Sequence, residues 1–195
     1  PIALFAAENL SPPWVSYPAR AFLAAFRSLP SILWAILFVI MVGLGPMAGI
    51  MAMTLYTVGY LGKLQYEAIE GVAKPQLDAS RAMGHGWFER SFGVVLPESA
   101  NNLISQAIFM FEYNFRHGTV IGIVGAGGIG YYINLYLEFL QYDKVFAYVI
   151  VIFIVVLILD LVSKIVRSMF KDDKQPNMPP WWTGLFLPAG LTKKL

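Results

Sequence analysis

The sequence has no cysteine, only two histidines and few charged residues. Without cysteine the chain can form neither a disulfide nor a thiolate metal site. His85 and His117 alone are too few for a histidine metal cluster. Charged residues make up 13% of the 195 residues, whereas about a quarter is usual in a soluble domain. So few charges could hardly cover a soluble surface, and their scarcity predicts a membrane protein.

The positive and negative charges nearly balance. The formal net charge is +2, and the lysines and arginines are spread through the loops without forming a basic stripe. This pattern argues against a nucleic-acid partner. The chain begins at Pro1 without the charged and apolar regions of a signal peptide, and we expect it to be a fragment.

Hydrophobic residues make up 57% of the chain, and the mean hydropathy of the chain is +0.61. Only the last apolar stretch approaches the roughly 20 residues that a straight membrane-spanning helix needs. The sequence GLGP at 43–46 predicts a tight turn between the first two apolar stretches, which end at Leu44 and begin at Pro46, because proline cannot continue a helix without losing a hydrogen bond. The first apolar stretch is short for a membrane span unless its helix starts further back, near Arg27. A broken or re-entrant segment is the alternative. The apolar stretches are Ser31 to Leu44, Pro46 to Leu61, Leu103 to Phe115, Val120 to Ile129 and Val145 to Val162.

The positions of the basic residues predict the topology. Lysine and arginine occur before residue 31, within 63–98 and after 162, whereas 131–143 has neither. The positive-inside rule places the three basic regions in the cytoplasm, which predicts four crossings. We therefore divide the chain into an interfacial segment (1–30), a transmembrane domain (31–170) with a cytoplasmic loop at about 63–98, and a proline-rich cytoplasmic tail (171–195).

The stretch TVIGIVGAGGIGYY contains the spacing G-x-G-x-x-G at Gly125, Gly127 and Gly130. A dinucleotide-binding turn needs a soluble strand-turn-helix unit and an acidic residue about 20 positions further on. Here Ile150 lies at that distance, inside an apolar run. We interpret the glycines, with Gly128, as a re-entrant or broken membrane segment beside a pore. A close helix-packing patch is the alternative.

The middle loop is polar but has helical signals. KPQLDASRAMG places Pro75 near a helix start and Gly84 at its stop. WFERSFGVVLPES then predicts a second short helix that ends before Pro97. Two short helices joined at GHG would form a compact knob on the cytoplasmic face, able to fit a groove on a soluble partner.

The loop sequence DASRAMGHGWFERSFGVVLP resembles the coupling motif of bacterial ABC importer permeases, E-A-A, three residues, Gly, nine residues, I-x-L-P. The spacing fits throughout, with mild substitutions of Asp for Glu, Ser for Ala and Val for Ile. The stretches FAAENL, VGLGPMAGI and FEYNFRHGTVIGIVGAGGIG are similar to the phosphonate-type branch, and more distantly to the methionine branch. Such permeases have at least one span upstream, which we expect to be missing here. The motif positions are Asp78, Ala79, Ser80, Gly84, Val94, Leu96 and Pro97.

The resemblance implies an all-α transmembrane fold, the type I ABC importer permease bundle, in a bacterial inner membrane. It implies a pore made of two permease copies, identical or closely paralogous, two ATPase subunits that bind the knobs, and a substrate-binding protein. ATP and Mg²⁺ would belong to the ATPases, so this chain would bind no cofactor and would not be an enzyme. The implied substrate is phosphonate or a related oxyanion such as phosphite or phosphate. A methionine or other small-solute permease is the alternative, and a membrane scaffold without transport is a remote one.

Polar residues also occur within the apolar segment FMFEYNFRHGT. Glu112 and Arg116, four apart with the acid first, share a helix face in the favourable order for an ion pair. Arg116, with Asn114 and Thr119, could meet a substrate oxyanion through its bidentate guanidinium, or Glu112 could satisfy Arg116 and lock helices together. At the outer membrane edge, the pair could instead belong to the contact with the binding protein. Members of the resembled branch carry an arginine where this chain has Met110, which puts the exact ligand in doubt. The pathway candidates are Glu112, Asn114, Arg116, His117, Thr119, Gly125, Gly127, Gly128 and Gly130.

Overall fold

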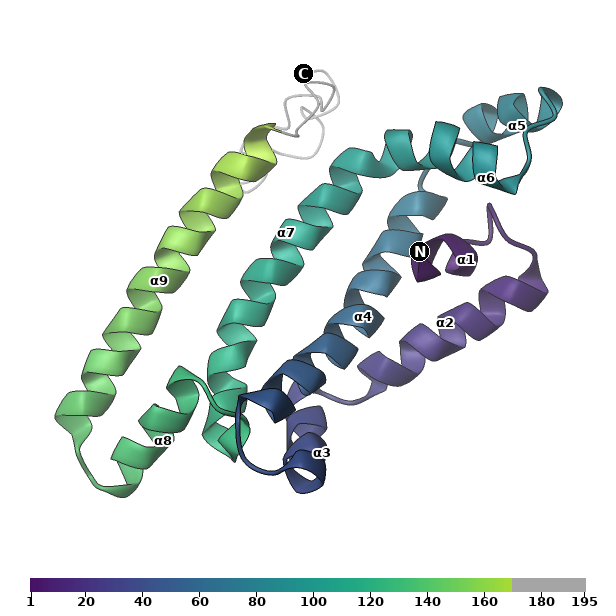
Figure 1. The fold of residues 1–195 in the computed structure, drawn as a ribbon. Coiled ribbons are helices and arrows are strands. Elements are labelled where there is room, and N and C mark those ends of the chain that lie inside the picture. Colours follow the sequence, from purple (N-terminus) through teal and green to yellow (C-terminus); the bar gives the residue numbers. More distant parts are fainter. Residues whose placement is uncertain (170–195) are drawn as a thin grey trace, which may run out of the picture.

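The computed structural model describes residues 1–169, which contain helices and turns but no strand (Figure 1). The predicted tail at 171–195 lies outside these residues. Without a strand in the described chain, the glycine spacing cannot belong to a strand-turn-helix nucleotide site. The elements are α1 (Ile2–Ala6), α2 (Pro13–Ser28), α3 (Ser31–Val42), α4 (Pro46–Glu70), α5 (Lys74–Ala82), α6 (Trp87–Arg90), the π-helical turn η1 (Ser91–Val95), α7 (Leu96–Ile121), the π-helical turn η2 (Gly122–Ala126), α8 (Ile129–Glu138) and α9 (Tyr142–Met169).

Helices α4 and α7 form the centre of the bundle. Helices α2 and α3 pack on α4, and α9 packs on α7 (Figure 1). Short helices α5 and α6 lie at one end of the bundle, which we call the knob end. Helix α3, η2 and α8 lie at the other end, which we call the glycine end. The long helices thus connect the two ends.

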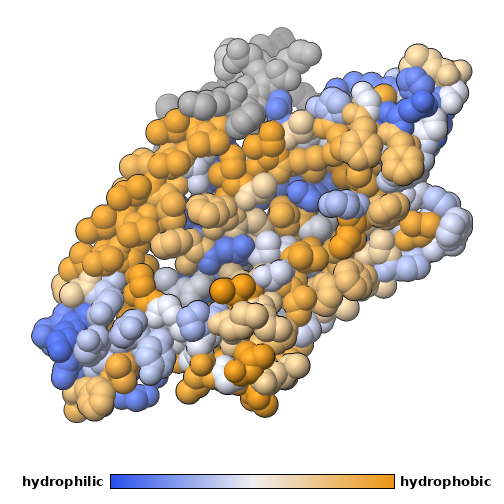
Figure 2. All heavy atoms as spheres, viewed as in Figure 1, coloured by the Kyte–Doolittle hydropathy of each residue, from blue (hydrophilic) through white to orange (hydrophobic). Residues whose placement is uncertain are grey.

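Within residues 1–169, one helix is long and apolar enough to cross a membrane, and the number rises to three if each of two bent pairs counts as one span. That helix is α9, whose mean hydropathy is 3.2 over its most apolar window. The bent pairs are α2 with α3 and the continuous helix 87–126 with α8. The hydrophobic surface over α9 and the hydrophilic surface over the α5–α6 end are visible in Figure 2.

The count is lower than the four crossings predicted, because α4 does not pass the same test. Its sequence has threonine, tyrosine and glycine where α9 has valine and isoleucine. Helix α4 is packed between α2, α3 and α7, so it needs less apolar surface than a helix beside lipid. It also continues to Glu70, so the loop begins at Gly71 rather than at about 63.

The first apolar helix does not start further back, near Arg27, and the structure has the alternative, a broken segment. Helix α2 ends at Ser28, α3 begins at Ser31, and their axes differ by 81°. Pro30 precedes α3 and has no N–H, so the α-helical ladder cannot run through it. The resulting bend makes α2 and α3 a broken pair rather than one straight helix.

The prediction of a helix that ends before Pro97 is wrong. The chain runs from α6 through η1 directly into α7, with Pro97 in the first turn of α7. In the wider π turn, the helix does not need the backbone N–H that Pro97 lacks. The carbonyl of Val95 accepts a hydrogen bond from Ser99 Oγ at 2.6 Å. The coupling motif is therefore continuous with a long central helix.

The N-terminal residues, predicted to be interfacial, contribute to a buried core at the knob end. Ala3, Leu4, Ala7 and Leu10 pack with residues of α4, α5 and η1. Arg20 pairs with Glu8 and with Glu70, and its guanidinium lies 4.7 Å from the ring centroid of Tyr66. The other buried residues of this core, which follow later in the chain, are Ile69, Val72, Leu77 and Val95. This core fixes α1 and the knob to the end of α4.

The predicted GLGP turn is confirmed, and it packs against the glycine-rich loop. Gly43 and Gly45 have φ of 87° and 146°, and Pro46 begins α4. The N–H of Gly45 donates to the carbonyl of Gly125 at 3.0 Å. A β-carbon on Gly127 would lie 2.8 Å from the nitrogen of Pro46. Such close backbone approach requires glycine.

Candidate functional site

The knob, residues 74–90, is a helix-turn-helix as the motif predicts. Helix α5 ends at Ala82, and Gly84 takes φ of 78°, a conformation that L side chains rarely adopt. The buried Ser80 Oγ lies 3.0 Å from His85 Nδ1 across the turn. Glu89 accepts a hydrogen bond from the N–H of Gly86 at 2.9 Å, which caps α6. The turn and the cap hold the two short helices at a fixed angle.

Of the other motif residues, some are exposed and some are packed. Asp78 is exposed and pairs with Arg81 one turn away, at 3.2 Å. Exposed pairs of this kind contribute less than about 1 kcal/mol, so Asp78 contributes little to knob stability. Ala79 and Pro97 are exposed, Val94 is half-buried, and Leu96 packs on the knob-end core.

The knob is tied to the N-terminal segment by three contacts. Arg81 Nη2 donates to the carbonyl of Asn9 at 3.2 Å, and Trp87 Nε1 donates to Ser11 Oγ at 3.3 Å. The rings of Phe5 and Trp87 stack with centroids 5.1 Å apart. Together with the buried core, these contacts make the knob, α1 and the end of α4 one packed unit. A displacement of the knob would therefore be transmitted to α4 as well as to α7.

The knob and the π turn after it expose three large apolar side chains. Met83, Phe88 and Phe92 are 65%, 72% and 59% exposed, although they lie in the most polar part of the chain. A cluster of exposed large apolar residues on a polar surface marks an interaction site. The motif residue Ser80 lies beneath this surface, so it supports the knob rather than forming its contact face.

Within the bundle, four charged side chains connect α7 to α9. Arg116 donates to Glu112 at 2.6 Å and to Asp160 at 2.5 Å, and Arg167 donates to Glu112 at 2.9 Å. Glu112 is buried, at 8% exposure, and a charge in such a place needs partners. The predicted pair of Glu112 and Arg116 is present, and each of its members has a further partner on α9.

The remaining candidates on α7 lie on another face. Asn114 is two residues from Glu112, about 200° around the helix, and its Oδ1 accepts from Thr57 of α4 at 3.0 Å. Thr119 donates to the carbonyl of Arg116 in its own helix at 2.7 Å. The structure therefore does not bring Arg116, Asn114 and Thr119 together around one point. The arginine is directed to α9 and the asparagine to α4.

Aromatic rings form a ladder between α4 and α7. The rings of Tyr56, Tyr60 and Tyr113 stack with centroids 5.8–5.9 Å apart, and the hydroxyls of Tyr56 and Tyr113 lie 3.1 Å from each other. His117 stacks on Tyr113 at 3.7 Å, and its Nδ1 is 3.2 Å from the carbonyl of Tyr113. His117 is thus a member of this ladder.

The glycine-rich segment is broken, as predicted. Gly125, Gly127 and Gly128 have φ between 75° and 88°, and the chain bends by 52° into α8. Gly127 and Gly128 line a pocket of about 300 Å³ with Asn114, which we call the glycine-loop pocket. Gly130 serves close packing instead, since a β-carbon there would lie 1.9 Å from the carbonyl oxygen of Thr119. The segment is thus broken at Gly125, Gly127 and Gly128 and closely packed at Gly130, and its position beside a pore stays a prediction.

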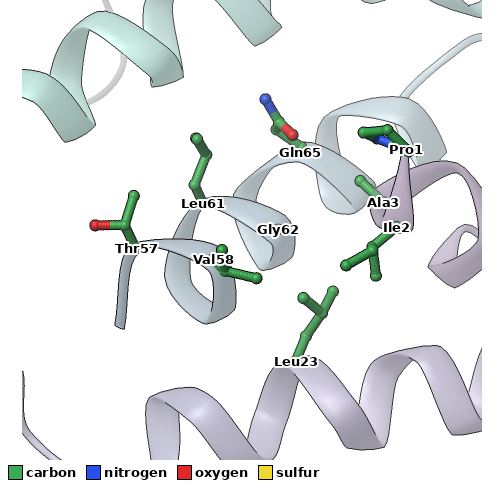
Figure 3. A pocket seen from close by; sticks show the side chains of 9 residues that line it. All are labelled: Pro1, Ile2, Ala3, Leu23, Thr57, Val58, Leu61, Gly62 and Gln65. Atoms are coloured by element: carbon green, nitrogen blue, oxygen red, sulfur yellow. The ribbon is translucent and has the colours of Figure 1, made fainter. Parts of the chain in front are cut away.

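A further pocket, about 200 Å³, lies between α1, α2 and α4 (Figure 3). Aliphatic side chains such as Leu23 and Leu61 surround it, with Thr57 and Gln65 as its polar side chains. None of its lining side chains is charged, and none belongs to the residues singled out from the sequence.

The bundle, the knob and the broken glycine segment together define a transport permease fold. Residues 1–171 match the family described as "Binding-protein-dependent transport system inner membrane component". The chain belongs to this family and is an inner-membrane protein.

Relatives and a solved structure agree with this family. The chain is 38% identical over 169 residues to the phosphate-import permease protein PhnE of Mycolicibacterium smegmatis, covering 86% of this chain and 32% of that protein. It is 40% identical over 171 residues to the phosphite transport system permease protein PtxC of Stutzerimonas stutzeri, covering 87% and 62%. The chain thus spans less than two thirds of the length of these relatives. An inward-facing structure of the MetNI methionine ABC transporter matches with a TM-score of 0.73 and 20% identity, covering 88% of this chain and 85% of that one.

The structural match shows a type I ABC importer permease fold, which confirms the predicted fold class. The sequence reasoning missed Asp160 and Arg167 as partners of the α7 charges, and Tyr56 and Tyr60 as partners of Tyr113. Asp160 carried a usable signal, because it is an acidic residue in the most apolar helix of the chain. The tyrosines carried none, since aromatic residues are frequent throughout this sequence.

Proposed function

We propose that this chain is the membrane-spanning permease subunit of an ATP-driven importer for phosphonate, phosphite or phosphate. In this proposal the knob lies in the cytoplasm and docks on an ATPase subunit, and a second permease copy completes the pore. A substrate-binding protein delivers the oxyanion at the glycine end. ATP and Mg²⁺ bind to the ATPase, and this chain catalyses no reaction.

The observation that carries the proposal is the knob. The coupling spacing folds as two short helices around a positive-φ glycine and continues through η1 into α7, and Met83, Phe88 and Phe92 are exposed on it. Because the knob is continuous with α7 and packed on α4, a movement of the ATPase would change the angle between the two central helices. The substrate class is supported by the 38–40% identity to permeases named for phosphate and phosphite.

The pathway residues follow from the geometry. We propose that the oxyanion passes the glycine-loop pocket, where the amide of Asn114 and the backbone N–H groups near Gly127 and Gly128 are available as donors. Glu112 and Arg116 lie at the α7–α9 contact, where their main role is to hold these helices together. Arg116 is 46% exposed in its side chain, so part of its charge still contributes to the potential of the path.

The docking surface can be tested with Phe88→Ser. We expect this variant to reduce co-purification of the ATPase subunit and to lower substrate-stimulated ATP hydrolysis, because it removes an exposed ring from the contact face. Phe139→Ser is the matched control for co-purification, since Phe139 is 64% exposed at the opposite end of the bundle. Equal recovery of the ATPase with both variants would remove this surface from the proposal.

A further inference from the structure

A separate cavity of about 400 Å³ opens at the knob end, between α4, α7 and α9. It shares no lining residue with the glycine-loop pocket. Its polar lining consists of Tyr60, Asn102, Ser105, Gln106 and Arg167. None of these residues was selected from the sequence, and the pathway described above does not use them.

Arg167 gives this cavity a cation with unused donors. A guanidinium has five N–H groups, and among the described residues Arg167 donates to the carbonyl of Ser163 and to Glu112. Glu112 is shared with Arg116, so it does not neutralise both arginines. Asp160 accepts from Arg116, and Lys164 lies one turn from Asp160 on α9. The ion-paired side chains thus comprise two cations and two carboxylates, and Lys164 adds a nearby positive charge.

The α7 side of the cavity supplies neutral donors. Asn102, Ser105 and Gln106 are spaced i, i+3, i+4, which places them on one helix face. Gln106 Oε1 is buried and has no hydrogen-bond partner within residues 1–169, so beside the donors this amide offers an unpaired acceptor, which suits an O–H of a protonated oxyanion. Two amides, a hydroxyl and a guanidinium around an open cavity form the donor set that an oxyanion requires.

We propose that this cavity is a second oxyanion site, which holds a phosphorus oxyanion at the knob end of the bundle. The singly protonated forms of phosphite and phosphate offer both acceptor oxygens and an O–H, so they suit amides that donate and accept. The substrate class rests on the proposed function, whereas the site rests on the cavity and its lining.

The test is calorimetric titration of the purified permease–ATPase complex with phosphite, without the binding protein. We expect Arg167→Gln to weaken binding about tenfold or more, because a charge-assisted contact is lost. Ser105→Leu fills the cavity without changing charge and should weaken binding similarly, even if Arg167→Gln is unstable. Lys144→Gln removes the same charge from the far end of α9 and should leave binding unchanged.

Two results would overturn the second site. One is wild-type complex that does not bind millimolar phosphite. The other is binding that Asn114→Leu abolishes while Arg167→Gln and Ser105→Leu leave it intact, which would locate the anion in the glycine-loop pocket. Uptake of phosphite by wild-type proteoliposomes is measured in parallel, and its absence would refute the proposed function instead.

Discussion

Replacing Glu112 with alanine tests the connection between α7 and α9. The carboxylate accepts from Arg116 at 2.6 Å and from Arg167 at 2.9 Å, and its side chain is 11% exposed. Removing one partner of a fully buried pair costs about 3–5 kcal/mol. Here the arginine side chains are 46% and 33% exposed and Asp160 remains as a partner for Arg116, so part of the loss is recovered in solvent. We expect a loss of about 2–3 kcal/mol.

The assay is thermal unfolding of the purified protein in detergent. For a chain of this size the loss corresponds to a Tm lower by about 4–10 °C. Asp160→Asn is the comparison, because its carboxylate is 37% exposed and contacts one arginine; it should lower Tm less. An unchanged Tm for Glu112→Ala, or a larger effect of Asp160→Asn, would refute the assignment of Glu112 as the centre of the ionic cluster.

The other predictions concern glycines. Gly130→Ala should destabilise the protein by about 1–3 kcal/mol, because its β-carbon would lie 1.9 Å from the backbone oxygen of Thr119. Gly118→Ala is the control, since a β-carbon there would have no atom within 4 Å. It should be neutral or stabilising in the same Tm measurement. Gly84→Val should strain the knob turn at φ of 78° by about 1–3 kcal/mol and reduce substrate-stimulated ATP hydrolysis, whereas Gly93→Ala, also in open space, should not. Wild-type hydrolysis by Gly84→Val would contradict the coupling role of the turn.

The sequence predicted the features that depend on local chemistry. The knob turn at Gly84, the turn before Pro46 and the break at the glycines follow from the backbone conformations that glycine and proline permit or exclude. The pair of Glu112 and Arg116 follows from helical spacing. These features need no knowledge of the neighbouring helices.

Features that depend on packing were predicted poorly. Pro97 was expected to end a helix, but a π turn before it keeps the chain helical. The packing of Leu4 and Leu10 in a buried core with Leu77 was not predicted, and the interfacial position expected for residues 1–30 stays a prediction. The partners Asp160 and Arg167 are more than 40 residues from Glu112 in sequence, so helical spacing could not connect them.

The central claim is that this chain carries phosphorus oxyanions through a membrane when an ATPase acts on its knob. The most direct measurement is uptake of labelled phosphite into proteoliposomes that contain this permease, its ATPase and its binding protein. We predict ATP-dependent uptake that excess phosphonate or phosphate inhibits and excess methionine does not. ATP-dependent uptake of methionine without uptake of phosphite would contradict the account.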